Sequence, residues 1–333
     1  PMYYIKNGLS KKWHWLAYLF AAFGVLTVFG TGNATQVNTI TTAINSALLN
    51  YNVISESAVS TSNLIIGIII AILIAMILLG GIKRIGHVTE KLVPFMALLY
   101  ILLGLGVILL NIQNVPAVFV SIFRGAFQPR AVTGGIVLSM FTSLKKGVSR
   151  GIFSNEAGLG TGSIAHACAD TKKPVKQGMF GIFEVFTDTI VICTMTGLSI
   201  VLTGAWQVEG LEGVQVTTYA FQHGLPIPGQ VSAFVLMICL VFFAFTTILG
   251  WDYYSERCLE YLTGGNMKKV MVFRWIYILA VFIGPYMTVS AVWTIADIFN
   301  GLMAIPNMIA LFALSGVIVK ETKTFFAAEK HKM

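Results

Sequence analysis

Residues 151–169 read GIFSNEAGLGTGSIAHACA, and this stretch decides which fold the chain can adopt. Its length and apolar residues suit a membrane-spanning helix, yet it holds Asn155, Glu156 and three glycines at alternate positions, Gly158, Gly160 and Gly162. Each glycine lowers the stability of a helix by roughly 1 kcal/mol relative to alanine. We therefore expect a helix that is interrupted near its middle.

The composition is that of a membrane protein. Hydrophobic residues make up 56% of the 333 residues and charged residues make up 11%, whereas soluble domains carry about 25% charge. A soluble protein of this composition would have too little polar surface to cover its core. We therefore expect an all-α, polytopic membrane protein that is embedded in a lipid bilayer.

A transmembrane helix needs roughly 20 mostly apolar residues, because the hydrocarbon core of a bilayer is about 30 Å thick. Eight stretches meet or nearly meet this requirement. We expect them to form a single transmembrane domain over residues 1–333. The expected spans are 13–49, 63–80, 92–112, 142–169, 178–202, 231–254, 269–285 and 294–319.

Lysine and arginine are concentrated in alternate loops. The N-terminal segment, the loops 81–91, 170–177 and 255–269, and the C-terminal tail are basic, whereas the loops 50–62 and 204–229 hold neither residue type. Cytoplasmic loops carry the excess of Lys and Arg. We therefore expect a multi-pass protein of the cell membrane with both ends of this chain in the cytoplasm. The basic loops also explain the net charge of +8 without a nucleic-acid partner.

Some cations do not follow this alternation, because they lie in or beside a loop that is expected outside: Arg124, Arg130, Lys145, Lys146 and Arg150. Two interpretations of them remain open. In the first, residues 132–147 form an amphipathic helix on the outer face of the membrane. In the second, these cations line the mouth of a water-filled cavity.

The interrupted span favours a transporter. Within a bilayer, irregular backbone persists only where it is buried in protein or lines a cavity. In transporters such breaks lie near the midplane, where helix N-termini face anionic groups and free carbonyls face cations. A phosphate-cradling loop is the first alternative, but no Lys follows the glycines and no strand precedes them. Glycines that only pack helices together are the second, and Asn155 and Glu156 argue against it.

A second candidate for binding is the segment FTTILGW, residues 245–251. The adjacent hydroxyls of Thr246 and Thr247 suit a hard cation such as sodium. Thr247 and Trp251 are four residues apart and therefore share one helix face, where a hydroxyl and an indole suit a small polar ligand. The alternative is that both threonines bond back to the preceding helical turn.

A third candidate lies in the first span, where Asn33, Gln36 and Thr39 recur at intervals of three residues. Residues at this spacing lie on one helix face and predict a polar stripe. Polar residues in a membrane helix usually face the bundle or a wet cavity. A binding surface and interhelical hydrogen bonds are equally good interpretations.

Acidic residues within the expected spans include Glu156, Glu184, Asp188 and Asp297. Glu184 and Asp188 share a helix face, and a structural ion pair is favoured over a proton relay for them. The sequence holds no nucleophile with a neighbouring base, no metal-binding triad and no motif for an organic cofactor. We therefore do not expect an enzyme.

Four segments resemble the sodium:alanine symporter family, the alanine or glycine:cation symporters. They are GVSRGIFSNEAGLGTGSIAHA (147–167), PMYYI (1–5), GGIKRIGHVTEKLVPFMALLYI (80–101) and FAFTTILGWDYYSERC (243–258). They occur in the order typical of the family and extend through most of the chain. The first of them is long and specific.

The resemblance implies a leucine-transporter-like fold of two five-helix inverted repeats with the binding site at their interface. It also implies that PMYYI follows two core helices, so that this chain is truncated at its N-terminus and lacks the first core helix. Asn155, Gly158, Gly160 and Thr161, with the unwound polar residue Glu156, match the broken sixth core helix.

On the remaining helices, Thr247 and Trp251 match substrate-pocket positions of the eighth core helix, and Gln36 matches a pocket-facing position of the third. Asn33 is a further candidate for the substrate site. Thr246 and Thr247 would bind sodium together with carbonyls of the missing helix.

These observations predict sodium-coupled symport of a small neutral amino acid, alanine or glycine, by alternating access. Sodium is the expected coupling ion, and no organic cofactor is expected. An ion channel and a non-transporting membrane fragment are the alternatives, although no repeated filter loop supports a channel.

Overall fold

The computed structural model describes residues 1–127 and 136–330, and every regular element in these ranges is helical. The α-helices are α1 (Met2–Gly8), α2 (Trp15–Thr27), α3 (Thr35–Asn50), α4 (Val59–Leu78), α5 (Gly81–Leu110), α6 (Val115–Phe127), α7 (Ile136–Asn155), α8 (Thr161–His166), α9 (Pro174–Val185), α10 (Thr194–Leu202), α11 (Val214–Gly224), α12 (Gly229–Thr263), α13 (Met267–Ala280) and α14 (Val289–Lys330). Short 3-10 turns are η1 (Lys11–Trp13), η3 (Glu56–Ala58), η4 (Ile112–Asn114), η6 (Ala205–Gln207) and η7 (Gly284–Tyr286).

Two segments have the wider π-helical turn. η2 (Val28–Ala34) joins α2 to α3, and η5 (Phe186–Cys193) joins α9 to α10. Each makes its two neighbours one continuous helical span. Because π turns shift the direction of the side chains that follow them, they often occur at functional sites.

In the described part of the chain, six helical stretches are long and apolar enough to cross a membrane. This makes the chain a multi-pass membrane protein and matches six of the expected spans. The stretches are Lys11–Asn50, Glu56–Leu78, Gly81–Leu110, Pro174–Leu202, Gly229–Thr263 and Val289–Ala328.

The other two expected spans have a different form. The span 142–169 is divided into α7 and α8 by a break, and neither helix is among the six long apolar stretches. The span 269–285 is the 14-residue α13, which carries Lys268, Lys269 and Arg274. A count of eight crossings therefore stays a prediction.

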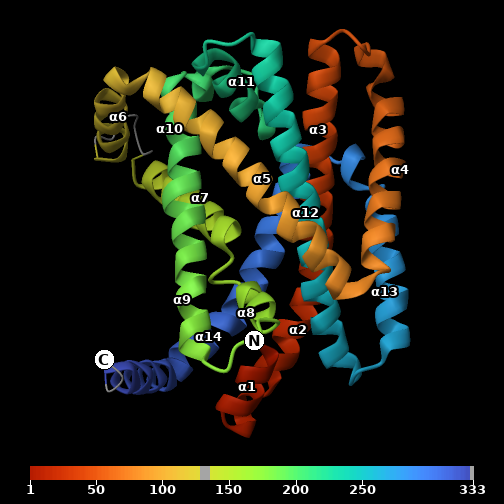
Figure 1. Cartoon of the computed structure of the whole chain (residues 1–333), viewed down its shortest axis with the longest axis vertical. Helices are drawn as coiled ribbons and strands as arrows, with labels where there is room; N and C mark the ends of the chain where they lie inside the picture. Colours follow the sequence, from red (N-terminus) through yellow and green to blue (C-terminus); the bar gives the residue numbers. More distant parts are fainter. Residues whose placement is uncertain (128–135, 331–333) are drawn as a thin grey trace.

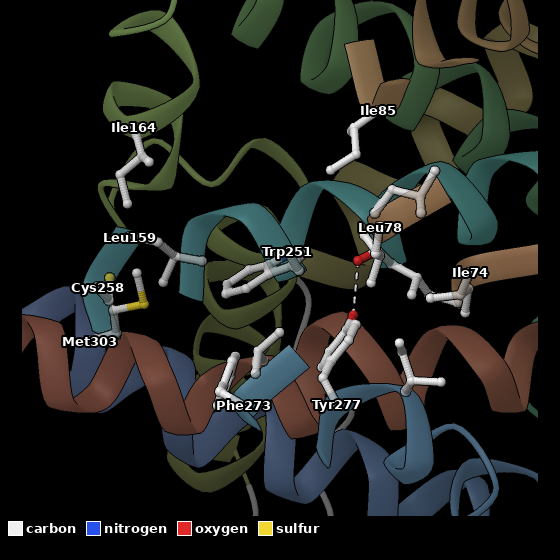
Figure 2. Close-up of a cluster of buried hydrophobic side chains, with 14 of the residues drawn as sticks. Ile74, Leu78, Ile85, Leu159, Ile164, Trp251, Cys258, Phe273, Tyr277 and Met303 are labelled. Atoms are coloured by element: carbon white, nitrogen blue, oxygen red, sulfur yellow. Dashed lines mark hydrogen bonds between the residues drawn. The ribbon is translucent and has the colours of Figure 1, made fainter. Parts of the chain in front are cut away.

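The long helix α12 organises the fold, because it packs against α2, α3, α5, α11 and α13. Figure 1 shows it in the middle of the molecule, with α3 beside it and α5 crossing it. Trp251 and Tyr277 belong to the larger cluster of buried apolar side chains, part of which is drawn in Figure 2. A smaller cluster around Tyr100, Phe221 and Leu236 joins α5, α11 and the first half of α12.

The outer faces of several helices remain apolar. Large side chains such as Ile65 on α4, Leu98 on α5 and Phe312 on α14 are exposed. Such faces suit contact with lipid tails, which are as apolar as the side chains themselves. Figure 1 also shows α1 and the end of α14 in the lower part of the molecule, where the connections α8–α9 and α12–α13 also lie.

Candidate functional site

The predicted interruption is present between α7 and α8, where residues 156–160 leave the helix. The side-chain Oδ1 of Asn155 accepts a hydrogen bond from the backbone N–H of Ala157 at 3.1 Å. Asparagine side chains often bond to nearby backbone groups in this way and so compete with the helical hydrogen bonds. Glu156 has a φ of 53° and Gly160 a φ of 88°. A side chain in this left-handed region costs about 1–3 kcal/mol, so surrounding contacts must hold Glu156 in place.

The carboxylate of Glu156 makes those contacts. Its Oε1 accepts a hydrogen bond from Trp251 Nε1 at 2.8 Å, and its Oε2 accepts one from Thr161 Oγ1 at 2.6 Å. Trp251 lies on α12 and Thr161 begins α8. One side chain thus joins both sides of the break to the central helix.

The end of α7 is attached to η5. Ser154 Oγ donates to Asp188 Oδ2 at 2.5 Å, and Asn155 Nδ2 donates to Thr189 Oγ1 at 3.0 Å. Asp188 therefore accepts hydroxyl bonds and pairs with no cation among the described residues, contrary to the expected ion pair. Glu184 contacts a histidine, because its Oε2 lies 3.0 Å from His166 Nε2.

Two cavities meet at the Glu156–Trp251 hydrogen bond. Cavity A, of about 450 Å³, lies between the break, α5, η5 and α12, and cavity B, of about 300 Å³, lies between the break, η2, α3 and α12. The shared lining residues are Ser154, Glu156, Thr247 and Trp251. The pair formed by the indole and the carboxylate therefore stands between the two spaces.

A third cavity extends the row. Cavity C, of about 270 Å³, is lined by Thr35, Asn38 and Glu212 and shares Thr39 with cavity B. Cavity A reaches Ile82 and Gly86 in the basic segment 81–91, which forms the first turns of α5, whereas cavity C reaches the acidic segment 204–229. The three cavities thus lead from the basic side of the chain to its acidic side.

The threonines of α12 line these cavities as their spacing predicts. Thr246 and Thr247 line cavity A, and Thr247 shares its face with Trp251 along cavity B. Their hydroxyls donate to Phe243 O, at 3.1 Å from Thr246 and 2.8 Å from Thr247. These are the back-bonds that formed the alternative interpretation. Because a hydroxyl that donates still has free lone pairs, its oxygen remains able to bind a cation.

The polar stripe of the first span is interrupted. Gln36 and Thr39 line cavity B, and Gln36 Nε2 donates to Thr31 O at 3.0 Å. Asn33 is fully buried against α13, where its Nδ2 donates to Tyr277 O at 2.9 Å. The spacing argument assumed an α-helix throughout, whereas Asn33 lies in η2, whose wider turns alter its direction. The stripe is therefore wrong at Asn33, and its role at the substrate site stays a prediction.

The glycines of the break contact α14. Gly158 O accepts a hydrogen bond from Asn307 Nδ2 at 3.0 Å, and a Cβ on Gly160 would lie 2.8 Å from Asn307 Oδ1. Tyr4 donates to the same Asn307 oxygen. Asn307 is fully buried and absent from the sequence-based candidates. A lone polar residue after Pro306, inside an expected span, was the available signal.

The cations near the break can be compared with the two interpretations. Arg150 Nη2 lies 2.6 Å from Asp297 Oδ2, and its guanidinium stands 4.1 Å from the centre of the Trp293 ring. Arg150 and Lys146 line a surface cavity of about 270 Å³, and residues 136–147 are helical, so both interpretations stay open. Of the proposed amphipathic helix, residues 132–135 lie outside the described residues.

A broken helix whose polar residues line a row of cavities through a multi-pass protein defines the class of membrane transporters. The chain belongs to the sodium:alanine symporter family, which it matches over residues 1–333. This membership confirms the family resemblance. It also places the chain among transport proteins, as expected for a chain that is not an enzyme.

Relatives from three organisms illustrate the similarity. An uncharacterized transporter of Haemophilus influenzae is 47% identical over 98% of this chain and 68% of its own length. The sodium/alanine symporter AgcS of Methanococcus maripaludis is 41% identical over 100% of this chain and 70% of its own length. The probable sodium/glutamine symporter GlnT of Bacillus subtilis is 35% identical over 99% of this chain and 65% of its own length. The chain thus spans about two thirds of the length of these relatives.

Proposed function

We propose that this chain takes part in sodium-coupled symport of a small neutral amino acid, alanine or glycine, by alternating access. The observation that carries the proposal is the row of cavities A, B and C, in which Glu156 and Trp251 separate the first two. Membership in the sodium:alanine symporter family supports the class of substrate and the coupling ion.

The substrate site is proposed at the break. The polar groups that line cavities A and B there include those of Asn155, Glu156, Gln36 and Thr247. Thr161 holds the carboxyl group of Glu156 by a hydrogen bond. Phe153, Phe243 and Trp251 give cavity B aromatic walls. A small pocket that combines polar groups with aromatic walls favours a zwitterion with a short side chain over glutamine.

Sodium is proposed to bind at Thr246 and Thr247. Sodium, as a hard cation, prefers oxygen ligands, and both hydroxyl oxygens keep lone pairs while they donate to Phe243 O. Since Thr247 also lines the proposed substrate pocket, sodium bound there would stabilise the substrate-bound state. Such a differential affinity is what allows an ion to shift a conformational equilibrium.

In the alternating-access cycle, the hydrogen bond between Glu156 and Trp251 acts as the partition. While it is formed, cavity A on the basic side is separated from cavities B and C on the acidic side. The basic side is proposed to be cytoplasmic, with both ends of this chain there, in the cell membrane. A leucine-transporter-like arrangement of one domain over residues 1–333, with α7–α8 and α13 completing eight crossings, fits this cycle.

The test is uptake by the purified chain in liposomes. Labelled alanine and glycine are offered under an inward sodium gradient, and a matched potassium gradient is the control. Saturable uptake that depends on sodium supports the proposal, whereas equal uptake in both gradients contradicts sodium coupling. Flux that rises linearly with substrate concentration would indicate a pore. If uptake is absent, equilibrium binding of labelled alanine is measured in detergent. Binding would indicate a non-transporting fragment, and no binding would indicate a chain with another substrate.

A further inference from the structure

A buried group of charges lies directly after the proposed site on α12. Asp252 follows Trp251 and is 1% exposed, and Glu256, one turn later on the same face, is 4% exposed. Arg274 on α13 faces them and is 9% exposed. Two carboxyl groups and one guanidinium therefore share the dry interface between α12 and α13.

The single guanidinium is already paired. Arg274 Nε donates to Glu256 Oε1 at 2.5 Å, and Arg274 Nη2 donates to Glu256 Oε2 at 2.8 Å. This two-point geometry is the strongest that arginine forms with a carboxylate. Glu256 is therefore the ionised partner of Arg274. Both carboxyl oxygens of Asp252 are buried and have no hydrogen-bond partner within the described ranges.

The surrounding elements supply no second cation. The other buried polar side chain of α13 is Tyr277, labelled in Figure 2, whose hydroxyl donates to Ile248 O at 2.8 Å and to Gly32 O at 3.0 Å. The segments α2, η2, α3 and α4 contain no Asp, Glu, Lys or Arg. Their single titratable group is Tyr18, which is exposed.

More distant charges on the neighbouring helices point away from Asp252. On α12 itself, Arg257 Nη1 pairs with Glu260 at 2.5 Å. The charged or titratable residues at the starts of α5 and α13 are exposed: Lys83, Arg84, His87, Glu90, Lys91, Lys268 and Lys269. An ionised Asp252 would thus be a buried negative charge without a counter-charge, which is strongly unfavourable.

A proton satisfies this site better than a metal ion. A bound sodium or calcium ion needs several oxygen ligands, and the other buried side-chain oxygens without a partner in the described part are Asn33 Oδ1 and the Tyr261 hydroxyl. The positive guanidinium of Arg274 beside the carboxyl also repels a cation. We propose that Asp252 is a proton-binding site, which is occupied in this conformation and exchanges its proton with water when the α12–α13 interface opens.

The proposed exchange is simple in chemical terms. The O–H bond of the carboxylic acid breaks, the proton passes to water, and a carboxylate remains until a proton returns. If the proposed transport function holds, movement of α12 around Trp251 would wet its neighbour Asp252, so uptake would depend on pH through this residue. The protonation itself does not require transport, so it can be tested alone.

Infrared spectroscopy of the purified chain tests the protonation. Carbon-13 in the side-chain carboxyl of aspartate separates aspartate bands from those of Glu156 and the other glutamates. At neutral pH we expect one band of a protonated aspartic acid that D252N removes. E256Q should also remove it, because Asp252 then becomes the ionised partner of Arg274. Absence of the band in the wild type, or its persistence in D252N, would overturn the proposal.

Two controls complete the experiment. Thermal unfolding verifies that each variant is folded, and if D252N does not fold, the outcome for E256Q decides. Binding of radioactive sodium is measured in parallel, and a loss of sodium binding in D252N without a protonated band would assign the site to sodium. In liposomes under a fixed sodium gradient, D252N should transport alanine with a flattened pH profile. Failure of uptake in the wild type as well as in the variants would refute the proposed function. The infrared result would still decide whether Asp252 binds a proton.

Discussion

Trp251 Nε1 donates a hydrogen bond to Glu156 Oε1 at 2.8 Å across a separation of 95 residues. This contact joins the central helix α12 to the break between α7 and α8, and it lies where cavities A and B meet. The indole and the carboxylate therefore link the break to the helix that organises the fold. The first predictions concern this pair.

Trp251→Phe keeps an aromatic ring but removes the N–H donor. Because a hydrogen bond contributes about 0.5–1.5 kcal/mol net, alanine affinity should fall roughly two- to tenfold. Binding of labelled alanine in detergent measures this change. Trp206→Phe on the exposed turn η6 is the matched control and should bind as the wild type does. Equal affinity in both variants would remove the hydrogen bond from the site.

Glu156→Ala and Glu156→Gly separate the loss of the carboxyl hydrogen bonds from the strain of the left-handed backbone at this position. Both leave the Trp251 and Thr161 donors without an acceptor, which should destabilise the chain by about 1–3 kcal/mol. Glycine, unlike alanine, adopts the φ of 53° without strain, a difference of about 1–2 kcal/mol. Thermal unfolding should therefore rank the wild type first, then E156G, then E156A. Identical melting of the two variants would show that the backbone here relaxes.

Thr247→Val removes the hydroxyl proposed to bind sodium while it keeps the shape of the side chain. The sodium concentration for half-maximal uptake should rise severalfold, because the ion loses an oxygen ligand. The control is Thr263→Val, since Thr263 lies on the same helix with the same 2.8 Å back-bond but lines none of the cavities. A similar shift in both variants would point to a general effect on α12.

Gly32→Ala should disturb the contact between η2 and α12. A Cβ on Gly32 would overlap with the side chain of Trp251, whereas one on Gly197 would meet nothing within 4 Å. Overpacking of this kind costs about 1–3 kcal/mol. We therefore expect a lower unfolding temperature and weaker alanine binding for G32A. G197A in α10 should be neutral or slightly stabilising, and a comparable loss there would contradict the packing argument.

Arg274→Gln and Arg150→Gln compare a buried ion pair with a partly exposed one. Removing Arg274 leaves Glu256 buried without its counter-charge and should cost about 3–5 kcal/mol. The Arg150–Asp297 pair has side-chain exposures of 35% and 29%, so its loss should cost about 1 kcal/mol or less. Chemical denaturation of the two variants measures the difference. Equal effects would mean that water reaches Arg274.

Local patterns predicted much of this arrangement. Hydrophobic stretches predicted the six long apolar helices, and the glycines with Asn155 predicted the break, because both depend on short segments of chain. Helical periodicity also predicted that Thr247 and Trp251 share a face. The same periodicity was wrong at Asn33, because the π-helical turns of η2 have no simple signature in the sequence.

The sequence by itself determined an all-helical membrane chain, the position of its broken span, and the family to which its motifs belong. These properties follow from hydrophobicity and backbone preference, which act over a few helical turns. Only the tertiary structure decided that Glu156 meets Trp251, that Asn307 supports the break, and that Asp252 lies buried without a partner. Such relations arise where distant helices pack together, and no local pattern specifies which side chains that packing brings into contact.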